Sequence, residues 1–510
     1  MYGARMFPWW TEKQKRLAED LAQFVDEELF PLSREYERSL KFPWKIARKV
    51  ADKGLFSIGF PEKYGGSGED YGTVGKCIVN EELGRIGFGM ITFYGTTVYG
   101  LGSPLTHFGS EYLKEKYLAK LTRGEILGAV CLTEPQSGSD AASMELSAHR
   151  DGDCYILNGK KRFISNAGVA DLYTVYCRTD LSPEAKAKYK HLSGFIVEAD
   201  TPGFTIEKVH ELCGLDGVLN GVLNFDNVRV PKENLLAQEG EGWKVMTGAL
   251  NAERVIGAAG QMGPTRTAIE STLEYTAHRI QFGRPINENQ GLQFMIADMV
   301  TMWTMARTMI YSTAYLIDQG EDPVLEASVS KLYASECMMK VAHHAVQLHG
   351  GDGYTKYYPV ERAFRDAKVR EISAGSNQIQ RLLIWRQALN RYRDLRQERK
   401  SMMPGKETKA DLPRAILELL AEDYLAHPGL FTDKEDLKYR LGIEDEERLK
   451  TALLGLEKEG LVSLYRSRPE TISLIKANHK GLSKAKPDDY YRMIPEWAQE
   501  DLQKRLKDIK

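Results

Sequence analysis

The chain has 510 residues, too many for one ordinary domain and enough to bury several hydrophobic cores. Apolar residues make up 42% and charged residues 27%, as in an ordinary globular protein, and the formal net charge of −2 gives no reason to expect a polyanionic partner. No apolar run approaches the length of a membrane span, and the N-terminus lacks a signal-peptide core. The six cysteines are scattered without a metal-type spacing. We therefore expect a cytoplasmic protein with reduced thiols, no metal site and no membrane contact.

Residues 1–125 are predicted to form an N-terminal helical domain. The segment 11–25 places apolar residues at 17, 21, 24 and 25, the spacing of one helical face. From 126 to 240 the apolar period changes to two, which predicts a middle domain of short antiparallel strands, barrel-like in outline. Within it, Asn158-Gly159 predicts a hairpin turn, and Asp151-Gly152 predicts another turn just before it.

Long helices return in residues 241–395, which predicts a C-terminal four-helix bundle. The strongest helices are expected at 265–278, 290–318, 323–349 and 376–395. From residue 396 the composition changes to a charged linker, followed by three short helical segments and two strands, an order typical of a winged helix. Residues 396–510 are therefore assigned to a linker and a small winged-helix-like extension. The expected fold class is α+β, mainly α.

Two neighbouring segments of the middle domain carry chemically useful side chains. Residues 130–143 read VCLTEPQSGSDAAS, a strand that leads into a glycine turn with several hydroxyls and backbone N–H groups. Such a turn can bond the edge of a flavin ring and its phosphates, although composition alone favours a structural turn. Arg162 to Asn166 then end a strand with an aromatic residue, Phe163, and a hydroxyl, Ser165.

Three further segments lie in the predicted bundle. Arg279 to Arg284 has an arginine at each end, and the planar fork of an arginine matches phosphate oxygens. Gln347 to Tyr354 contains glycines that permit close approach of a backbone, and Glu371 to Arg381 follows. Taken together and in order, these segments resemble the acyl-CoA dehydrogenase family. The resemblance covers about residues 10–395.

The resemblance implies an FAD site. Thr133 would contact the pyrimidine edge of the flavin and Ser139 the pyrophosphate, while Phe163 and Ser165 stand where the family usually has tryptophan and threonine. The segment from Arg279 to Gln290 resembles one that reaches a neighbouring subunit's FAD, which implies a homotetramer. The implied FAD-binding residues are Thr133, Ser139, Phe163, Ser165, Arg279, Gln281, Phe282, Gln290, Gln347, Gly351, Ser376 and Gln378.

The resemblance also implies a relocated catalytic base. Ala374 occupies the position where most of the family carries the glutamate that removes the substrate's α-proton, whereas Glu253 matches the base of isovaleryl-CoA and long-chain types. Glu253 is therefore the expected base, with Arg254 and Ala374 in the substrate site. Enclosure in an apolar pocket would raise the pKa of such a carboxylate. An exposed helix carboxylate is the alternative interpretation of Glu253, and Glu371 is its nearest rival as base.

The expected function is FAD-dependent α,β-dehydrogenation of an acyl-CoA thioester to the 2-enoyl-CoA, with electrons passed to electron-transfer flavoprotein. An oxidase of the same fold is an alternative that the sequence does not separate. A flavin-containing DNA-binding protein is another, but residues 401–510 carry 20 Lys+Arg against 21 Asp+Glu, so DNA is not the expected partner and an oligomer-building or docking module is. Gly89 stands roughly where a glutaryl-CoA enzyme has a substrate-binding arginine, which argues against dicarboxylic acyl groups. The sequence sets neither the length nor the branching of the acyl chain.

Overall fold

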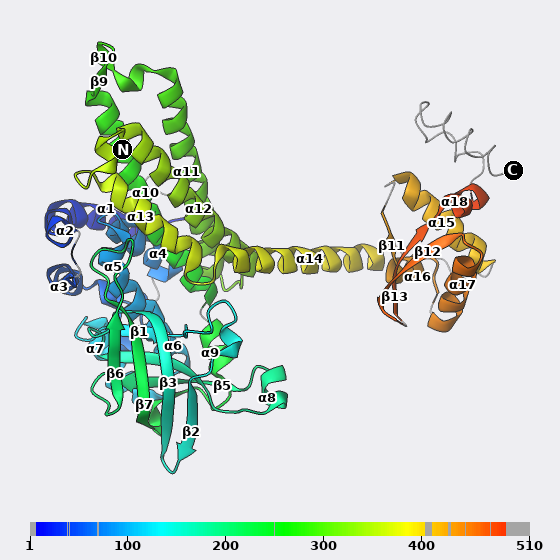
Figure 1. Ribbon diagram of the computed structural model, residues 1–510, viewed down its shortest axis with the longest axis horizontal. Helices are drawn as coiled ribbons and strands as arrows, with labels where there is room; N and C mark the ends of the chain where they lie inside the picture. Colours follow the sequence, from blue (N-terminus) through cyan, green and yellow to red (C-terminus); the bar gives the residue numbers. More distant parts are fainter. Residues whose placement is uncertain are drawn as a thin grey trace. The chain divides into compact units, whose positions relative to one another are not determined.

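The protein divides into two compact units, Met1–Ala388 and Leu389–Lys510, shown in a computed structural model (Figure 1). The structure describes residues 7–37, 39, 41–68, 71–248, 250–402, 411–426, 430–443, 445–469 and 471–485. The described part of the chain contains no helix that is both long and apolar enough to cross a membrane.

The first unit begins with helices, as predicted. The helix α1 (Glu12–Phe24) starts at a capping box in which Thr11 and Gln14 exchange hydrogen bonds, and it buries Leu21 and Phe24. The other helices of this region are α2 (Phe30–Tyr36), α3 (Trp44–Asp52), α4 (Gly72–Gly84), α5 (Phe88–Gly95), α6 (Ser103–Phe108) and α7 (Glu111–Thr122).

A mixed sheet follows these helices. Its strands are β1 (Gly128–Cys131), β2 (Ser147–Asp151), β3 (Cys154–Ser165), β4 (Leu172–Arg178), β5 (Leu192–Glu198), β6 (Phe204–Val209), β7 (Asn220–Pro231) and β8 (Leu235–Leu236), with helix α8 (Pro183–Ala187) between β4 and β5. The order is β6-β7-β3-β2-β4-β5-β8, and β1 pairs with β4. The expectation of a wholly antiparallel sheet is wrong, because β1 and β2 both run parallel to β4.

The predicted hairpin turn at Asn158-Gly159 is also wrong. Both residues lie inside β3, whereas the other predicted turn, at Asp151-Gly152, is where the chain reverses between β2 and β3. The glycine at 159 has φ 138° and sits at a shift of register against β7. A Cβ there would lie 2.9 Å from the Cα of Leu146, so this glycine serves a bulge with close backbone approach, not a turn.

The bundle consists of α9 (Gly242–Gly248), α10 (Leu250–His278), α11 (Gln290–Asp318), α12 (Val324–His349), α13 (Pro359–Ile372) and α14 (Asn377–Met402). The hairpin β9 (Ile280–Gln281) and β10 (Arg284–Pro285) joins α10 to α11. Two boundaries differ from expectation. The helix α10 begins before residue 265, and α14 continues through residues 396–402, where a linker was predicted.

The packing of α10 against α4 explains why the helix starts before residue 265. Gly260 and Gly263 weaken a helix in isolation, but they allow α10 to pack closely against α4. A Cβ at Gly263 would lie 2.2 Å from the backbone oxygen of Glu81. Tertiary contact with α4 therefore replaces the missing helix propensity of this segment.

Buried charges join α4 to the bundle. Arg307 of α11 donates to Glu81 at 2.8 Å, and the Tyr311 hydroxyl donates to the same carboxylate at 2.6 Å. Arg266 of α10 donates to Glu82 at 2.9 Å. These partners are buried, so the two carboxylates hold α10 and α11 in one position against α4.

The second unit has its own hydrophobic core. Its elements are α15 (Leu412–Ala426), β11 (Thr432–Asp433), α16 (Lys434–Arg440), α17 (Glu446–Lys458), β12 (Val462–Arg468), β13 (Thr471–Ala477) and α18 (His479–Ala485). The strands pair in the order β11-β13-β12. Ile416, Leu437, Leu453 and Ile475 are fully buried in this core.

A buried ion pair secures the loop after β1. The ammonium of Lys161 on β3 donates to Glu134 at 2.7 Å and to the Leu132 carbonyl at 3.0 Å, and both side chains are buried. The Glu134 carboxylate also accepts from the backbone N–H groups of Glu145 and Leu146. Burial lowers the pKa of Lys161, and the Glu134 charge opposes this shift. The pair therefore fixes the loop against β3.

Replacing Lys161 with Met is expected to cost about 3–5 kcal/mol of stability, since it leaves the Glu134 carboxylate buried without a counter-charge. The adjacent Lys160 pairs with Glu207 at an exposed site, so Lys160→Met should cost at most about 1 kcal/mol. Urea titration followed by circular dichroism measures both. Equal destabilisation of the two variants would contradict a structural role for the buried pair.

Candidate active site

Glu253 lies in the first turn of α10, where this helix meets the sheet. The side chain is half-buried, and burial raises the pKa of its carboxyl, while Arg254 and Arg370 oppose the rise. Burial also raises the pKa of Tyr176 on β4, and the Glu253 charge adds to that rise. The predicted base is therefore a half-buried carboxylate between two arginines and a sheet tyrosine, not an exposed helix residue.

Arg370, near the end of α13, links Glu253 to the segment around Ala374. Its Nη1 donates to the Ser373 hydroxyl at 3.2 Å, directly before Ala374. Its Nη2 would lie 3.3 Å from a Cβ at Gly257, one helical turn after Glu253. The guanidinium also lies 4.4 Å from the ring centre of Phe88. Ala374 is exposed, with φ 54°, and carries no group that could act as a base.

The surroundings of Glu253 are rich in positive charge. Arg254 donates to Asn251 at 3.1 Å, and the fully buried Lys331 on α12 donates to Asn377 at 2.9 Å. Burial, followed by repulsion from Arg370 and Arg254, lowers the pKa of Lys331 to about 7. The rival base Glu371 accepts instead from Lys368 at 2.6 Å. The sequence indicated Arg254 but not Lys331 or Arg370 as a site residue, because only tertiary packing brings Arg370 near Glu253 and Lys331 near the two arginines.

The predicted flavin residues of the sheet lie around one bulge of β3. Phe163 has φ 59° and is 51% exposed, with the Arg162 guanidinium 4.5 Å and the His210 ring 5.0 Å from its ring centre. Ser165 accepts from Asn220 at 3.4 Å. Within the described residues, the hydroxyls of Thr133 and Ser139 have no hydrogen-bond partner.

These residues fit a flavin. Two buried atoms beside Phe163 and Ser165, His210 Nε2 and Asn220 Oδ1, lack partners among the described residues. Open space surrounds Gly138 in the preceding loop. An exposed aromatic face, free hydroxyls and unsatisfied polar atoms are what an isoalloxazine ring and its phosphates require.

The remaining predicted FAD residues separate into two groups. Ser376 and Gln378 flank Asn377, which bonds Lys331, so they belong to the Glu253 end of the bundle. Arg279, Gln281, Phe282 and Gln290 lie at the opposite end of α10, in and beside the β9–β10 hairpin (Figure 1). Gln347 and Gly351 lie at that far end too, because the neighbouring His349 ring stacks on Tyr275 at 4.4 Å.

The distance between the two groups is large. A helix with the 29 residues of α10 is about 43 Å long at 1.5 Å per residue. The two groups of one chain therefore cannot bind the same part of one FAD molecule.

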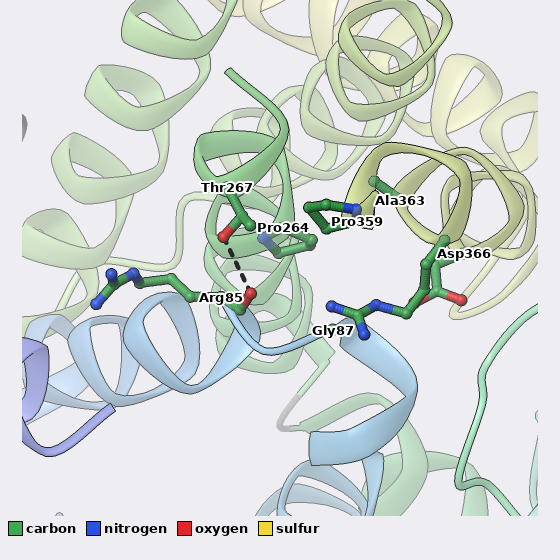
Figure 2. Close-up of a pocket in the computed structure, with 8 residues that line it drawn as sticks. Arg85, Gly87, Pro264, Thr267, Pro359, Ala363 and Asp366 are labelled. Carbon is green, nitrogen blue, oxygen red and sulfur yellow. Dashed lines mark hydrogen bonds between the residues drawn. The ribbon is translucent and has the colours of Figure 1, made fainter. Parts of the chain in front are cut away.

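A small pocket lies elsewhere, where the start of α5 and the end of α4 meet α10 and α13 (Figure 2). It has a volume of about 10 Å³, enough for one water molecule. Its lining includes Arg85, Pro264 and Asp366, and the Thr267 hydroxyl donates across it to the Arg85 carbonyl at 3.0 Å. Burial raises the pKa of Asp366 to about 6. This pocket is too small for an acyl group.

Among the described residues, no group of three or more His, Cys, Asp or Glu side chains could hold a metal ion.

Comparison with known proteins identifies the family of the chain. Family models match in order: the acyl-CoA dehydrogenase N-terminal domain over residues 11–125, the middle domain over 129–228 and the C-terminal domain over 240–389. An acyl-CoA dehydrogenase of Bacillus subtilis is 41% identical over 73% of this chain and 97% of its own length.

Two solved structures show the same fold. Butyryl-CoA dehydrogenase from Megasphaera elsdenii has a TM-score of 0.71, with 34% identity over 75% of this chain and all of its own. A chain from a study of the electron transferring flavoprotein of Acidaminococcus fermentans has a TM-score of 0.72 and 37% identity over 75% of this chain and all of its own. The chain is therefore an enzyme of the FAD-dependent acyl-CoA dehydrogenase family.

Proposed function

We propose that this protein converts an acyl-CoA thioester to the 2-enoyl-CoA with Glu253 as the base. The observation that carries the proposal is the half-buried Glu253, whose pKa burial raises, opposite a segment in which Ala374 offers no carboxylate. A raised pKa makes a carboxylate a stronger proton acceptor, and enclosure keeps it from being solvated.

The residues of the site have separate roles in the proposed reaction. Glu253 accepts the α-proton, and Arg254 lies beside the negative charge that develops on the thioester as the proton leaves. FAD, when bound, supplies the two-electron acceptor for the β-hydrogen. Thr133, Ser139, Phe163 and Ser165 hold the flavin on the sheet side, and Ser376 and Gln378 hold it from the start of α14.

Replacing Glu253 with Gln tests the base. The variant should lower kcat by about 10²–10⁴-fold, the usual contribution of a positioned base, while the flavin stays bound. In the wild type, kcat should rise with pH through the raised pKa of Glu253, since only the ionised carboxylate accepts a proton. Turnover of a panel of straight and branched acyl-CoAs with an artificial electron acceptor measures kcat and its pH dependence, and anaerobic bleaching of the flavin shows directly which thioesters reduce it.

The matched control is Glu371→Gln, which removes the rival carboxylate that pairs with Lys368. It should leave kcat within about threefold of the wild type, because a carboxylate that is paired with Lys368 is not needed as the base. Loss of activity in this variant and not in Glu253→Gln would assign the base to Glu371. A flavin that no thioester reduces would reject the proposed reaction itself.

We further propose electron-transfer flavoprotein as the electron acceptor, with oxygen as the alternative. The support is the family of named dehydrogenases and the related chain from the Acidaminococcus fermentans study. The acyl-CoA-reduced protein should therefore stay reduced for minutes in air-saturated buffer and reoxidise rapidly when electron-transfer flavoprotein is added. Rapid reoxidation by oxygen alone, followed by absorbance of the flavin, would identify an oxidase.

We propose a homotetramer in which the β9–β10 hairpin reaches a neighbouring chain's FAD. The hairpin carries Phe282, which is 98% exposed, and Ile280 is exposed beside it. Exposed apolar side chains at such a tip are typical of a surface that another chain covers. The separation of the two FAD groups along α10 supports the same arrangement.

Phe282→Asp should therefore lower both the fraction of four-chain particles and the flavin content of the purified protein. Leu181→Asp, at another exposed loop, is the control and should change neither. Sedimentation velocity gives the assembly, and the ratio of absorbances at 450 and 280 nm gives the flavin content. Unchanged values for Phe282→Asp would reject a role of the hairpin in assembly.

We propose that the second unit is a winged-helix-like docking module. Its order of helices, its three-stranded sheet and its separate core support this assignment. DNA is a poor fit, because several basic side chains are neutralised locally: Lys434 by Glu446, Arg440 by Asp423 and Arg466 by Glu457. The helix α17 also begins with two glutamates, which would face phosphates unfavourably.

A further inference from the structure

The loop between β6 and β7, residues 210–219, begins at the proposed flavin face of the sheet. The centre of the His210 ring lies 5.0 Å from that of the Phe163 ring, and the backbone N–H of His210 donates to the Asn220 carbonyl at 2.6 Å. The Asn220 side chain in turn donates to the Ser165 hydroxyl at 3.4 Å. A shift of this loop would therefore move the side chains that surround Phe163 and Ser165.

The middle of the loop leaves the sheet and enters the core of the helices. Leu215 and Val218 are buried in that core, whereas buried residues of β6 and β7 belong to the separate core of the sheet. Leu215 has φ 62°, which is uncommon for a residue other than glycine. A Cβ at Gly89 of α5 would lie 2.5 Å from the Leu215 carbonyl carbon, so the loop lies tightly against α5. Contacts with other elements therefore hold this part of the backbone in place.

Asp366 on α13 supplies the central contact of the loop. Its Oδ1 accepts from the backbone N–H of Leu215 at 2.6 Å, and Asp366 is 1% exposed. The adjacent Arg365 donates to both carboxylate oxygens of Asp216, at 3.1 and 3.0 Å, and to the Cys213 carbonyl at 3.3 Å. Two successive residues of α13 thus hold the middle of the loop.

The hydrogen bond from the loop to Asp366 has a charged acceptor at neutral pH. Burial raises the pKa of the Asp366 carboxyl to about 6, and the charge of Asp216 adds to the rise. The hydrogen bond from Leu215 and the charges of Arg362 and Arg365 oppose it. Above this pKa the carboxylate is ionised, and a hydrogen bond to an ionised acceptor is roughly twice as strong as one between neutral groups. The contact with Leu215 is therefore stronger at neutral pH than below the pKa.

The second carboxylate oxygen of Asp366 contacts no donor of the protein. Its Oδ2 is buried without a partner among the described residues, and Asp366 lines the small pocket beside α10 (Figure 2). Arg85 also lines this pocket, but its guanidinium points away and pairs with Glu82 at 3.1 Å. Within the described part of the chain, Leu215 is thus the only hydrogen-bond donor to this carboxylate.

Resting on the proposed flavin site, we propose that Asp366 is a positioning residue for the flavin, which holds the loop 210–219 so that His210 stays beside Phe163. Asp366 lies away from the proposed flavin and thioester contacts, so it acts through Leu215 and the loop. Loosening this contact should leave thioester binding in place and slow the transfer to the flavin, because a small displacement of one reactant lowers the rate strongly.

Replacing Asp366 with Asn tests the inference, since it keeps the size and one acceptor oxygen but removes the charge. With the purified holoprotein under anaerobic conditions, the rate of flavin bleaching is measured against the concentration of the acyl-CoA that reacts fastest. The maximal rate should fall by about tenfold or more, and the half-saturating concentration should stay within about threefold of the wild type.

Gly214→Ala is an independent variant that leaves Asp366 intact. A Cβ at Gly214 would lie 2.7 Å from the Arg365 carbonyl carbon, so the methyl group pushes the loop away from α13. It should lower the maximal rate as Asp366→Asn does. Lys368→Gln is the matched control, because Lys368 lies on the same helix but is exposed and paired with Glu371. This control should change neither value.

The visible circular dichroism of the bound flavin provides a readout that a merely structural role would not change. In the wild type it should change in one step near pH 6, where Asp366 becomes protonated and Leu215 loses its charged acceptor. The step should persist in Glu253→Gln, which removes the other carboxyl whose pKa burial raises near the flavin site. It should be absent from Asp366→Asn.

The outcomes separate this inference from the proposed function. If no thioester bleaches the flavin, the dehydrogenation fails, while the circular dichroism of the flavin still tests Asp366. If folded Asp366→Asn or Gly214→Ala bleaches at the wild-type rate, the inference is overturned. It is also overturned if the step near pH 6 is missing from the wild type or survives in Asp366→Asn. Flavin content and far-ultraviolet circular dichroism establish folding, and if Asp366→Asn does not fold, Gly214→Ala and the wild-type titration decide.

Discussion

The buried ion pairs between α4 and the bundle set the geometry on which the rest of the first unit depends. Glu81 and Glu82 are adjacent on α4, and they bind Arg307 of α11 and Arg266 of α10. A buried carboxylate that loses its partner is strongly destabilising, so neither helix can slide along α4 without breaking a pair. The glycines of α10 bring its backbone against α4 at the same level. Together these contacts fix the direction of α10 and, with it, the position of Glu253.

The length of α10 then determines how the site is built. Glu253 lies at one end of the helix, near Tyr176 of the sheet and Arg370 of α13, while the hairpin with Phe282 lies at the other. In the proposed tetramer, a single chain would contribute half of each of two different FAD sites. Assembly and flavin binding would then depend on each other, because the projecting hairpin of one chain would complete a site only on another.

The elements with strong, local signals were predictable from the sequence. The helix expected at 290–318 is α11, Gln290–Asp318, and the backbone of Arg162, next to Phe163 in the β3 bulge, donates to the Thr133 carbonyl. The wrong predictions share a cause, which is tertiary packing that local sequence patterns do not reveal. Asn158-Gly159 has the composition of a turn, but in the structure the glycine lies at a bulge of β3, in close contact with Leu146. Residues 250–264 contain several glycines and Pro264, yet packing against α4 makes them helical. Arg370 is one charge among several in its segment, and only its contacts with Phe88 and Gly257 place it beside Glu253.

The two arginines affect the proposed base in opposite ways. Their charges favour the ionised form of Glu253 and so weaken it as a proton acceptor, while burial strengthens it. Burial has the larger effect, so the pKa of Glu253 stays above its ordinary value even with both charges nearby. The proposed base therefore depends more on the packing that keeps water away from its carboxylate than on either arginine.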